Sequence, residues 1–160
     1  MKTLFILVSL IIVLFLAAPE KVEAQKLTVA MKKQLASALI ESAEELRGCI
    51  GEAGLDRIVN IKALSLNSGG KQYLITGKAD GYDCSYGARS PMHWIFERRD
   101  GEFRMLADIG ACDRVQVTTR RTNGYFDIKI GSYYIARPRF SSAIYKYDGT
   151  TYKCPTCGHD

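Results

Sequence analysis

Alternating apolar and polar residues fill the middle of the chain, between residues 92 and 130. Two turn signals, Asp100-Gly101 and Asn123-Gly124, interrupt this stretch, and aromatic and branched residues flank both of them. Asp-Gly and Asn-Gly favour the type I′ turn of a β-hairpin, because that turn needs a positive φ at both of its central residues. The pattern predicts an antiparallel meander, and a third signal at Asp148-Gly149 predicts a closing hairpin.

The first strand of this stretch carries apolar residues on both of its faces. Trp94 and Phe96 alternate with His93 and Ile95, and successive side chains of a strand point to opposite faces of its sheet. We therefore expect a helix to cover one face of the sheet and the other face to be partly covered as well.

A helical pattern precedes the strands. Between residues 25 and 48, apolar residues recur at three- and four-residue steps, a spacing typical of an amphipathic helix packed on a sheet. Alternation then predicts strands over residues 57–66 and 72–76, joined by a turn that contains Asn67 and two glycines. The apolar stripe of the helix consists of Leu27, Met31, Leu35, Leu39 and Leu46.

These elements predict an α+β fold, with an N-terminal amphipathic helix packed on an antiparallel β-meander of about six to eight strands. The alternative is a small all-β sandwich or partial barrel with the helix at its periphery. Both architectures place the strands of the central stretch at the middle of the molecule.

The first 24 residues have the composition of a secretory signal peptide. Lys2 supplies a positive charge, an apolar run extends from Leu4 to Ala18, and Val22-Glu23-Ala24 offers a small-x-small cleavage site. We expect an exported protein, periplasmic or extracellular. Residues 25–154 are expected to form a single α+β domain, followed by a polar C-terminal tail at residues 155–160.

The formal net charge of +5 at pH 7 makes the chain mildly basic. This charge suits an anionic polymer or a membrane face, although the blocks Arg98-Arg99 and Arg120-Arg121 are more often solvated strand ends. The partner that we expect is an unknown protein or an anionic surface ligand. Nucleic acid is not expected as a partner, because an exported chain without a recognised nucleic-acid motif gives no reason for it. Stable membrane insertion is not expected once the signal peptide has been cleaved, since the apolar run lies within that peptide.

Five cysteines follow the signal peptide, and export permits disulfide bonds between them. The odd number leaves at least one thiol free or paired between molecules. The arrangement that we favour pairs Cys84 with Cys112 and Cys154 with Cys157, and it leaves Cys49 buried or free. The sequence leaves other connectivities open.

Residues 77–92 have the composition of a long loop, with several glycines and Pro91. Tyr82 and Tyr86 bracket Cys84 within it, and Arg89 follows closely. Tyrosine and arginine often dominate the contact energy of interfaces. The binding residues that we predict are therefore Tyr82, Tyr86 and Arg89; the alternative is a loop that Cys84 pins to the sheet.

The C-terminal motif Cys154-Pro155-Thr156-Cys157 has the spacing of a redox pair or of half a zinc site. With His159 the two cysteines supply three zinc ligands, whereas a structural site needs four. We favour a disulfide that anchors the tail. A metal- or redox-active protein that uses this tail is the alternative function.

Three short motifs resemble those of uncharacterised secreted bacterial proteins. The Leu-Asn-x-Gly-Gly turn at residues 66–70 is similar to a degenerate calcium turn of FG-GAP and VCBS-like repeats, and residues 123–128 and 147–152 resemble turn elements of such secreted proteins. The resemblance implies an extracytoplasmic β-rich domain and no established activity. The calcium site does not carry over, because Asn67 stands without the several carboxylates that a calcium loop needs.

No catalytic residues are predicted. His93 lacks a recognisable nucleophile motif, and the carboxylates Glu97, Asp100, Glu102 and Asp108 follow no spacing of paired catalytic acids. We expect an exported, non-catalytic binding or interaction protein, neither an enzyme nor dependent on a cofactor. A weak hydrolase centred on His93 is the remaining class.

Overall fold

A computed structural model of the chain describes residues 27–78, 90–134 and 139–155. Helices form the first part: α1 (Val29–Ser42), the 3-10 helix η1 (Glu44–Leu46), α2 (Arg47–Ala53) and α3 (Leu55–Ile58). Eight strands follow within the described residues: β1 (Val59–Leu64), β2 (Lys71–Gly77), β3 (Met92–Arg99), β4 (Glu102–Ala111), β5 (Arg114–Thr122), β6 (Tyr125–Tyr134), β7 (Arg139–Tyr147) and β8 (Tyr152–Lys153).

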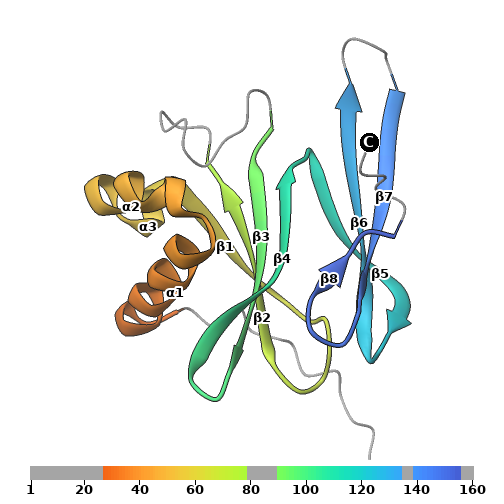
Figure 1. Cartoon of the computed structure of the whole chain (residues 1–160), viewed down its shortest axis with the longest axis horizontal. Helices are drawn as coiled ribbons and strands as arrows, with labels where there is room; N and C mark the ends of the chain where they lie inside the picture. The colour runs from red at the N-terminus through yellow and green to blue at the C-terminus, as the bar shows by residue number, and fades with distance from the viewer. Residues whose placement is uncertain (1–26, 79–89, 135–138, 156–160) are drawn as a thin grey trace, which may run out of the picture.

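The strands form two antiparallel sheets, ordered β1-β2-β3-β4 and β5-β6-β7-β8. The helices, the first sheet and the second sheet lie side by side as three layers, from left to right in Figure 1. The α+β class and the antiparallel meander are confirmed, but the expected single sheet is divided into two. The division falls after β4, where Gly110 takes φ 73° and the β3–β4 pairing shifts register beside His93. Bulges of this kind bend a strand and end its pairing.

The expected helix over residues 25–48 is interrupted at Ala43, which takes φ −143°. Thr28 caps the start of α1, where its side-chain oxygen accepts a hydrogen bond from the Met31 amide at 3.2 Å. Glu44 and Glu45 would lie unfavourably at the C-terminal end of a continuous helix. The interruption places both of them in the first turn of η1 instead, where the helix dipole favours negative charge.

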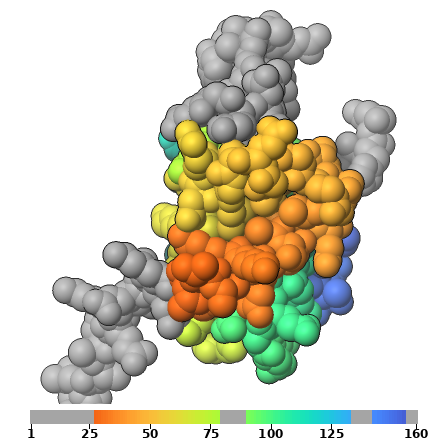
Figure 2. Space-filling view, turned by 90° about the vertical axis from the view of Figure 1, so that its left-hand side faces the viewer, coloured from red at the N-terminus to blue at the C-terminus, as the bar shows by residue number. Residues whose placement is uncertain are grey.

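One apolar core lies between the helices and the first sheet. Leu35, Leu39 and Leu46 of the predicted stripe are fully buried there. Figure 2 shows α1 in orange and α2 and α3 in yellow, spread over this face of the molecule. The sheet contributes the side chains that alternation assigned to one face of β3, together with two from β2: Tyr73, Ile75, Trp94 and Phe96.

A second apolar core lies between the two sheets. Ile95 is fully buried in it and belongs to the opposite face of β3 from Trp94 and Phe96. The prediction that both faces of this strand are covered is therefore confirmed. The other buried members are Leu66, Leu74, Leu106, Ala107, Ile109, Cys112, Tyr125, Ile128, Tyr147 and Tyr152.

Two of the three turn signals form the turn that they predict. Asp100 and Gly101 have φ values of 52° and 90°, and Asn123 and Gly124 have values of 50° and 82°. At the third signal only Gly149 has a positive φ, of 110°. Asp148 there accepts hydrogen bonds from the amides of Thr150 and Thr151, both at 2.8 Å. The β7–β8 hairpin consequently has a longer loop than a type I′ turn.

One strand prediction is corrected by neighbouring structure. The strand expected over residues 57–66 begins at Val59, because α3 takes the residues before it. In β6, Tyr125 is buried and Phe126 only partly so. The cause is an irregularity in β5, where Val117 pairs with Ile128 but Arg121 pairs with Phe126.

We predict that Ile95→Ala will lower the free energy of unfolding by about 2–5 kcal/mol, because it leaves a cavity between two packed sheets. Val29→Ala is the control: Val29 is 87% exposed, and its truncation is expected to change stability by less than about 0.5 kcal/mol. Urea unfolding followed by tryptophan fluorescence measures both variants. Equal stabilities would show that the second sheet does not bury this face.

Candidate functional site

A buried carboxylate lies between the two sheets. β3 directs Phe96 toward the helices, so its neighbour Glu97 points the other way, toward the second sheet. The Glu97 side chain is fully buried. A charge in such a place is stable only when it is paired and hydrogen-bonded.

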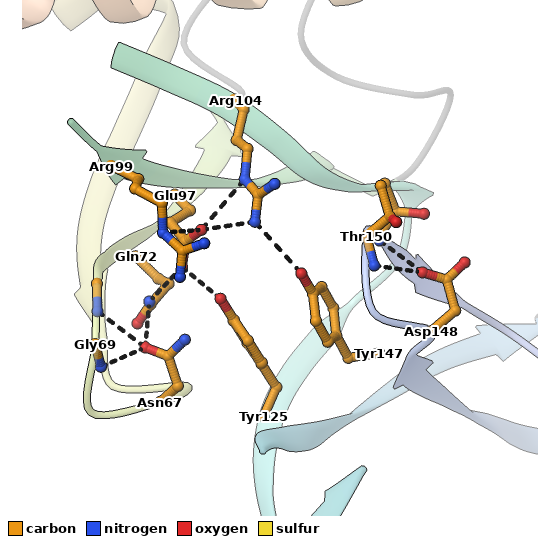
Figure 3. Close-up of polar contacts among 12 residues, drawn as sticks. Asn67, Gly69, Gln72, Glu97, Arg99, Arg104, Tyr125, Tyr147, Asp148 and Thr150 are labelled. Atoms are coloured by element: carbon orange, nitrogen blue, oxygen red, sulfur yellow. Dashed lines mark hydrogen bonds and ion pairs between the residues drawn. The ribbon is translucent and has the colours of Figure 1, made fainter. Parts of the chain in front are cut away.

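Both oxygens of Glu97 accept hydrogen bonds from neighbouring strands (Figure 3). Tyr125 of β6 donates its hydroxyl to Oε1 at 2.6 Å, and Gln72 of β2 donates Nε2 to the same oxygen at 3.0 Å. Arg104 of β4 donates Nη2 at 2.9 Å and Nε at 3.2 Å to Oε2. The carboxylate therefore ties three strands of the first sheet to one strand of the second.

The same contacts set the ionisation of Glu97. Burial by itself raises the pKa of the carboxyl, but the hydrogen bonds from Tyr125, Gln72 and Arg104 and the Arg104 charge outweigh burial and leave the pKa of Glu97 lowered. Burial and the adjacent carboxylate raise the pKa of Tyr125 to about 12. Glu97 is thus anionic and Tyr125 neutral at physiological pH.

The turn between β1 and β2 positions Gln72. Asn67 Oδ1 accepts hydrogen bonds from the amides of Gly69 and Gly70, both at 3.0 Å, and from Gln72 Nε2 at 2.8 Å. A Cβ at Gly70 would lie 2.7 Å from Glu97 Oε1, so no larger residue fits without displacing the carboxylate. The Asn67 oxygen that resembles a calcium ligand faces three N–H donors.

Three tyrosines of the second sheet lie in contact with one another beside Glu97. The Tyr125 and Tyr147 rings stack with centroids 3.9 Å apart, and Tyr152 meets Tyr125 edge-on at 6.3 Å. Tyr147 also accepts a hydrogen bond from Arg104 at 3.3 Å. We call Gln72, Glu97, Arg104, Tyr125 and Tyr147 the Glu97 cluster. Its donors and acceptors are directed at one another, which is the arrangement of a clamp between the sheets.

His93 lies on the same face of β3 and is 5% exposed. Its Nδ1 lies 3.0 Å from Thr76 Oγ1, and its Nε2 lies 3.0 Å from the Cys112 carbonyl oxygen, which fixes Nε2 as the protonated nitrogen. Burial lowers the pKa of His93, and the Cys112 contact opposes this shift. Both ring nitrogens therefore serve the packing of β2 and β3 against the start of the second sheet.

A groove opens where edge strand β1 faces edge strand β5. Its volume is about 550 Å³, within the range of roughly 300–1,000 Å³ that small-molecule sites occupy. We call it the β1–β5 groove. Its lining contains no acidic side chain and consists of Lys62, Leu64, Leu74, Val115, Gln116, Val117, Thr118 and Lys129.

The two lysines of the β1–β5 groove come from different sheets. Lys62 pairs with Leu74 across β1 and β2, so both side chains share the face that looks toward the second sheet. Lys129 comes from β6. Neither lysine forms a salt bridge with a described carboxylate. Val117 is 40% exposed, although it is apolar. The groove therefore combines an apolar wall with unpaired positive charge.

A second groove of similar size lies at the opposite edge, between β4 and the β7–β8 hairpin. Asp108 and Lys153 line it together with Tyr145 and Cys154. Burial raises the pKa of Tyr145, and Cys112 and Asp108 raise it further. Because this lining carries charges of both signs, it favours neither anionic nor cationic ligands. The β1–β5 groove is therefore the better-defined candidate site.

The predicted binding residues Tyr82, Tyr86 and Arg89 lie outside the described residues. So do Cys84 and the tail residues Cys157 and His159 of the alternative zinc set. Among the residues that the structure describes, no three His, Cys, Asp or Glu side chains are grouped closely enough to hold a metal ion.

The cysteine predictions require two corrections. Cys112, which we expected to pair with Cys84, is a buried free thiol whose hydrogen points at the Arg114 carbonyl oxygen, 3.7 Å away. Cys49, expected to be buried or free, is disulfide-bonded, as is Cys154. Cys112 faces the second apolar core, where a small apolar side chain is what the packing requires.

Sequence reasoning missed both Glu97 and the β1–β5 groove. The spacing of the carboxylates does not distinguish Glu97 from Asp100, Glu102 and Asp108, yet Glu97 lies inside a strand, directly after the apolar run Trp94-Ile95-Phe96. A carboxylate that continues a buried apolar strand is a sequence signal for a paired, buried charge. Lys62 and Val117 gave no signal, because only the packing of two sheets brings β1 and β5 together.

Comparisons with known proteins add no relative: no family model matches the chain, and neither the curated proteins nor the solved structures contain a match. In the described part of the chain, no helix has the length and apolar character needed to cross a membrane.

We predict that Glu97→Gln will lower the free energy of unfolding at pH 7 by about 1–3 kcal/mol, because the neutral amide loses the charged hydrogen bonds. The pKa of Glu97 lies below its ordinary value of 4.5 in the folded protein. Its stabilisation is therefore present above about pH 4.5 and is lost as the pH falls through the folded pKa. We expect urea unfolding between pH 7 and pH 3 to show that the free energies of unfolding of the natural protein and of Glu97→Gln become equal in acid.

Glu102→Gln is the matched control, because Glu102 is exposed in the β3–β4 hairpin. It should leave both the stability and its pH dependence unchanged. If Glu97→Gln were as stable as this control at pH 7, the Glu97 carboxylate would not stabilise the contact between the two sheets.

Cys112 is predicted to resist thiol alkylation in the native protein. It is 1% exposed, and burial raises its pKa to about 11, so little thiolate forms. Iodoacetamide in urea without reductant should label it, and peptide mass spectrometry identifies the site. Cys112→Ser should remove that label. Labelling of Cys49 or Cys154 under these conditions would contradict their disulfide-bonded state.

Proposed function

We propose that this chain is an exported, non-catalytic binding protein whose ligand is an amphipathic anion held in the β1–β5 groove. One observation carries the proposal: Lys62 and Lys129 border a groove that is otherwise apolar or neutral and contains no carboxylate. A small molecule with an apolar body and one acidic group matches both parts of this lining.

The apolar body and the acidic group of such a ligand contribute differently to its binding. An apolar chain gains about 0.8 kcal/mol for each methylene that it buries, and Leu64, Leu74, Val115 and Val117 supply the surface. The lysines are exposed to solvent, so their contribution is selectivity for an anion rather than most of the affinity. A fatty carboxylate is the simplest ligand of this class.

A non-catalytic role is supported by where the reactive side chains lie. The two nitrogens of His93 are engaged with Thr76 and Cys112, and the Glu97 carboxylate is covered on both oxygens. Neither residue lines the β1–β5 groove. The groove itself offers ammonium groups, amide and hydroxyl groups and apolar surface, which are binding groups.

Isothermal titration of the protein with dodecanoate, below its micelle concentration, tests the proposal. We expect saturable binding of dodecanoate, and weaker binding of dodecanol because the alcohol lacks the charge. Lys62→Glu should weaken dodecanoate binding by about tenfold, because it replaces a charge-assisted contact by repulsion.

Lys33→Glu provides the matched control. It makes the same change of charge on the exposed side of α1, far in the fold from the β1–β5 groove. Absence of saturable dodecanoate binding, or an equal loss of affinity in Lys33→Glu and Lys62→Glu, would overturn the proposal.

A further inference from the structure

The β1–β5 groove runs along the edge of β5. Four consecutive residues of this strand line the groove, from Val115 to Thr118. Successive side chains of a strand point to opposite faces of its sheet. Val115 packs against the core between the sheets, so its neighbour Gln116 points to the outward face. A groove that contacts residues of both faces meets the strand at its edge, where the main chain lies.

This edge carries main-chain groups that the protein does not pair. β5 is the end strand of its sheet, and β6 is its only neighbour in that sheet. In an antiparallel pair, alternate residues direct their N–H and C=O groups away from the partner strand. Among the described residues, no backbone group outside the β5–β6 ladder bonds to Val115, Gln116 or Val117. Such an edge is a template for a further extended chain.

The regular part of this edge is short. The β5–β6 register is regular through Val117 and is next defined at Arg121, after an irregularity. Irregularities of this kind prevent a long sheet from growing at an edge. The four residues that line the groove extend over about 13 Å. A partner strand of about four residues therefore matches the edge.

The rest of the lining suits the side chains and the end of such a strand. Leu64 and Leu74 of the first sheet line the groove together with β5, and Val117 is 40% exposed at the edge itself. An extended chain that presents apolar residues at alternate positions would cover this apolar wall. Lys62 and Lys129 supply positive charge without a described carboxylate to pair with, and the free C-terminus of a peptide supplies one carboxylate.

We propose that the amphipathic anion of the β1–β5 groove is a short extended peptide with a free C-terminal carboxylate, which adds to the edge of β5 as an extra strand. This inference rests on the proposed function and names the chemical class of its ligand. Main-chain hydrogen bonds to β5 supply affinity for any sequence, and the apolar wall selects alternate apolar side chains. The lysines favour a free carboxylate over a blocked terminus.

A second copy of this chain matches the edge less well than a peptide does. Pairing of β5 with the β5 of another copy would bring together two strands that each carry Arg114, Arg120 and Arg121 and no acidic residue. Both copies would also bring Lys62 and Lys129 to the contact. Like charges across an interface disfavour a partner. A peptide whose only charge is its carboxylate avoids this repulsion.

Isothermal titration with a tetrapeptide tests the inference. We expect saturable binding of acetyl-Thr-Val-Thr-Leu with a free C-terminus, and binding of its C-terminal amide about fivefold more weakly, because the lysines are exposed. Four further peptides each carry one N-methyl group, at successive amides. Methylation at alternate amides should weaken binding at least about tenfold, and methylation at the amides between them should change it little, because only every second N–H of a paired strand faces its partner.

Dodecanoate, titrated in parallel, separates this inference from the proposed function. If dodecanoate binds but the four methylated peptides show no two-residue alternation, the peptide class is wrong and the anion site stands. If neither dodecanoate nor the peptide binds, both proposals fail. Dodecanoate should also displace the peptide, because the two share one groove, and simultaneous binding of both would contradict the assignment.

Two protein variants locate the bound peptide. Lys62→Glu should weaken binding of the free-acid peptide about tenfold, whereas Lys33→Glu makes the same change of charge on α1 and should leave it unchanged; equal losses would contradict the site. Sedimentation velocity identifies the remaining occupant. A dimer that the peptide does not dissociate would assign the β5 edge to a second copy of the chain and overturn the inference.

Discussion

The hydrogen-bonded carboxylate of Glu97 is the constraint on which the arrangement of the two sheets depends. Apolar burial pushes the sheets together but is non-directional, so it would tolerate many relative positions. The Glu97 cluster does not, because Tyr125 of the second sheet must reach the same oxygen as Gln72 of the first. A buried charge that lost these partners would be strongly destabilising. The clamp therefore fixes one position among those that packing allows.

The proposed binding groove follows from that position. The sheets are joined through their interiors, and their edge strands β1 and β5 are not paired with each other, so a groove remains between the edges. The packing of the two sheets thus leaves Lys62 and Lys129 beside an open groove.

The sequence determined the local structure and the two-sided character of the central strands. Type I′ turns depend on two residues whose backbone tolerates a positive φ, so Asp100-Gly101 and Asn123-Gly124 could be recognised without knowing their partners. The same holds for the apolar stripe of α1 and for Trp94, Ile95 and Phe96, since alternation alone shows that both faces of β3 need a cover. These are properties of neighbouring residues.

Tertiary structure decided what covers the second face, which described cysteine stays reduced and where the candidate groove lies. The division of the meander into two sheets depends on the bend near Gly110, and it places Cys112 in an apolar core away from any disulfide. Glu97 and Tyr125, and likewise Lys62 and Val117, are far apart in sequence and meet only through that division. Spacing along a chain carries no information about such meetings, because they depend on how whole sheets pack.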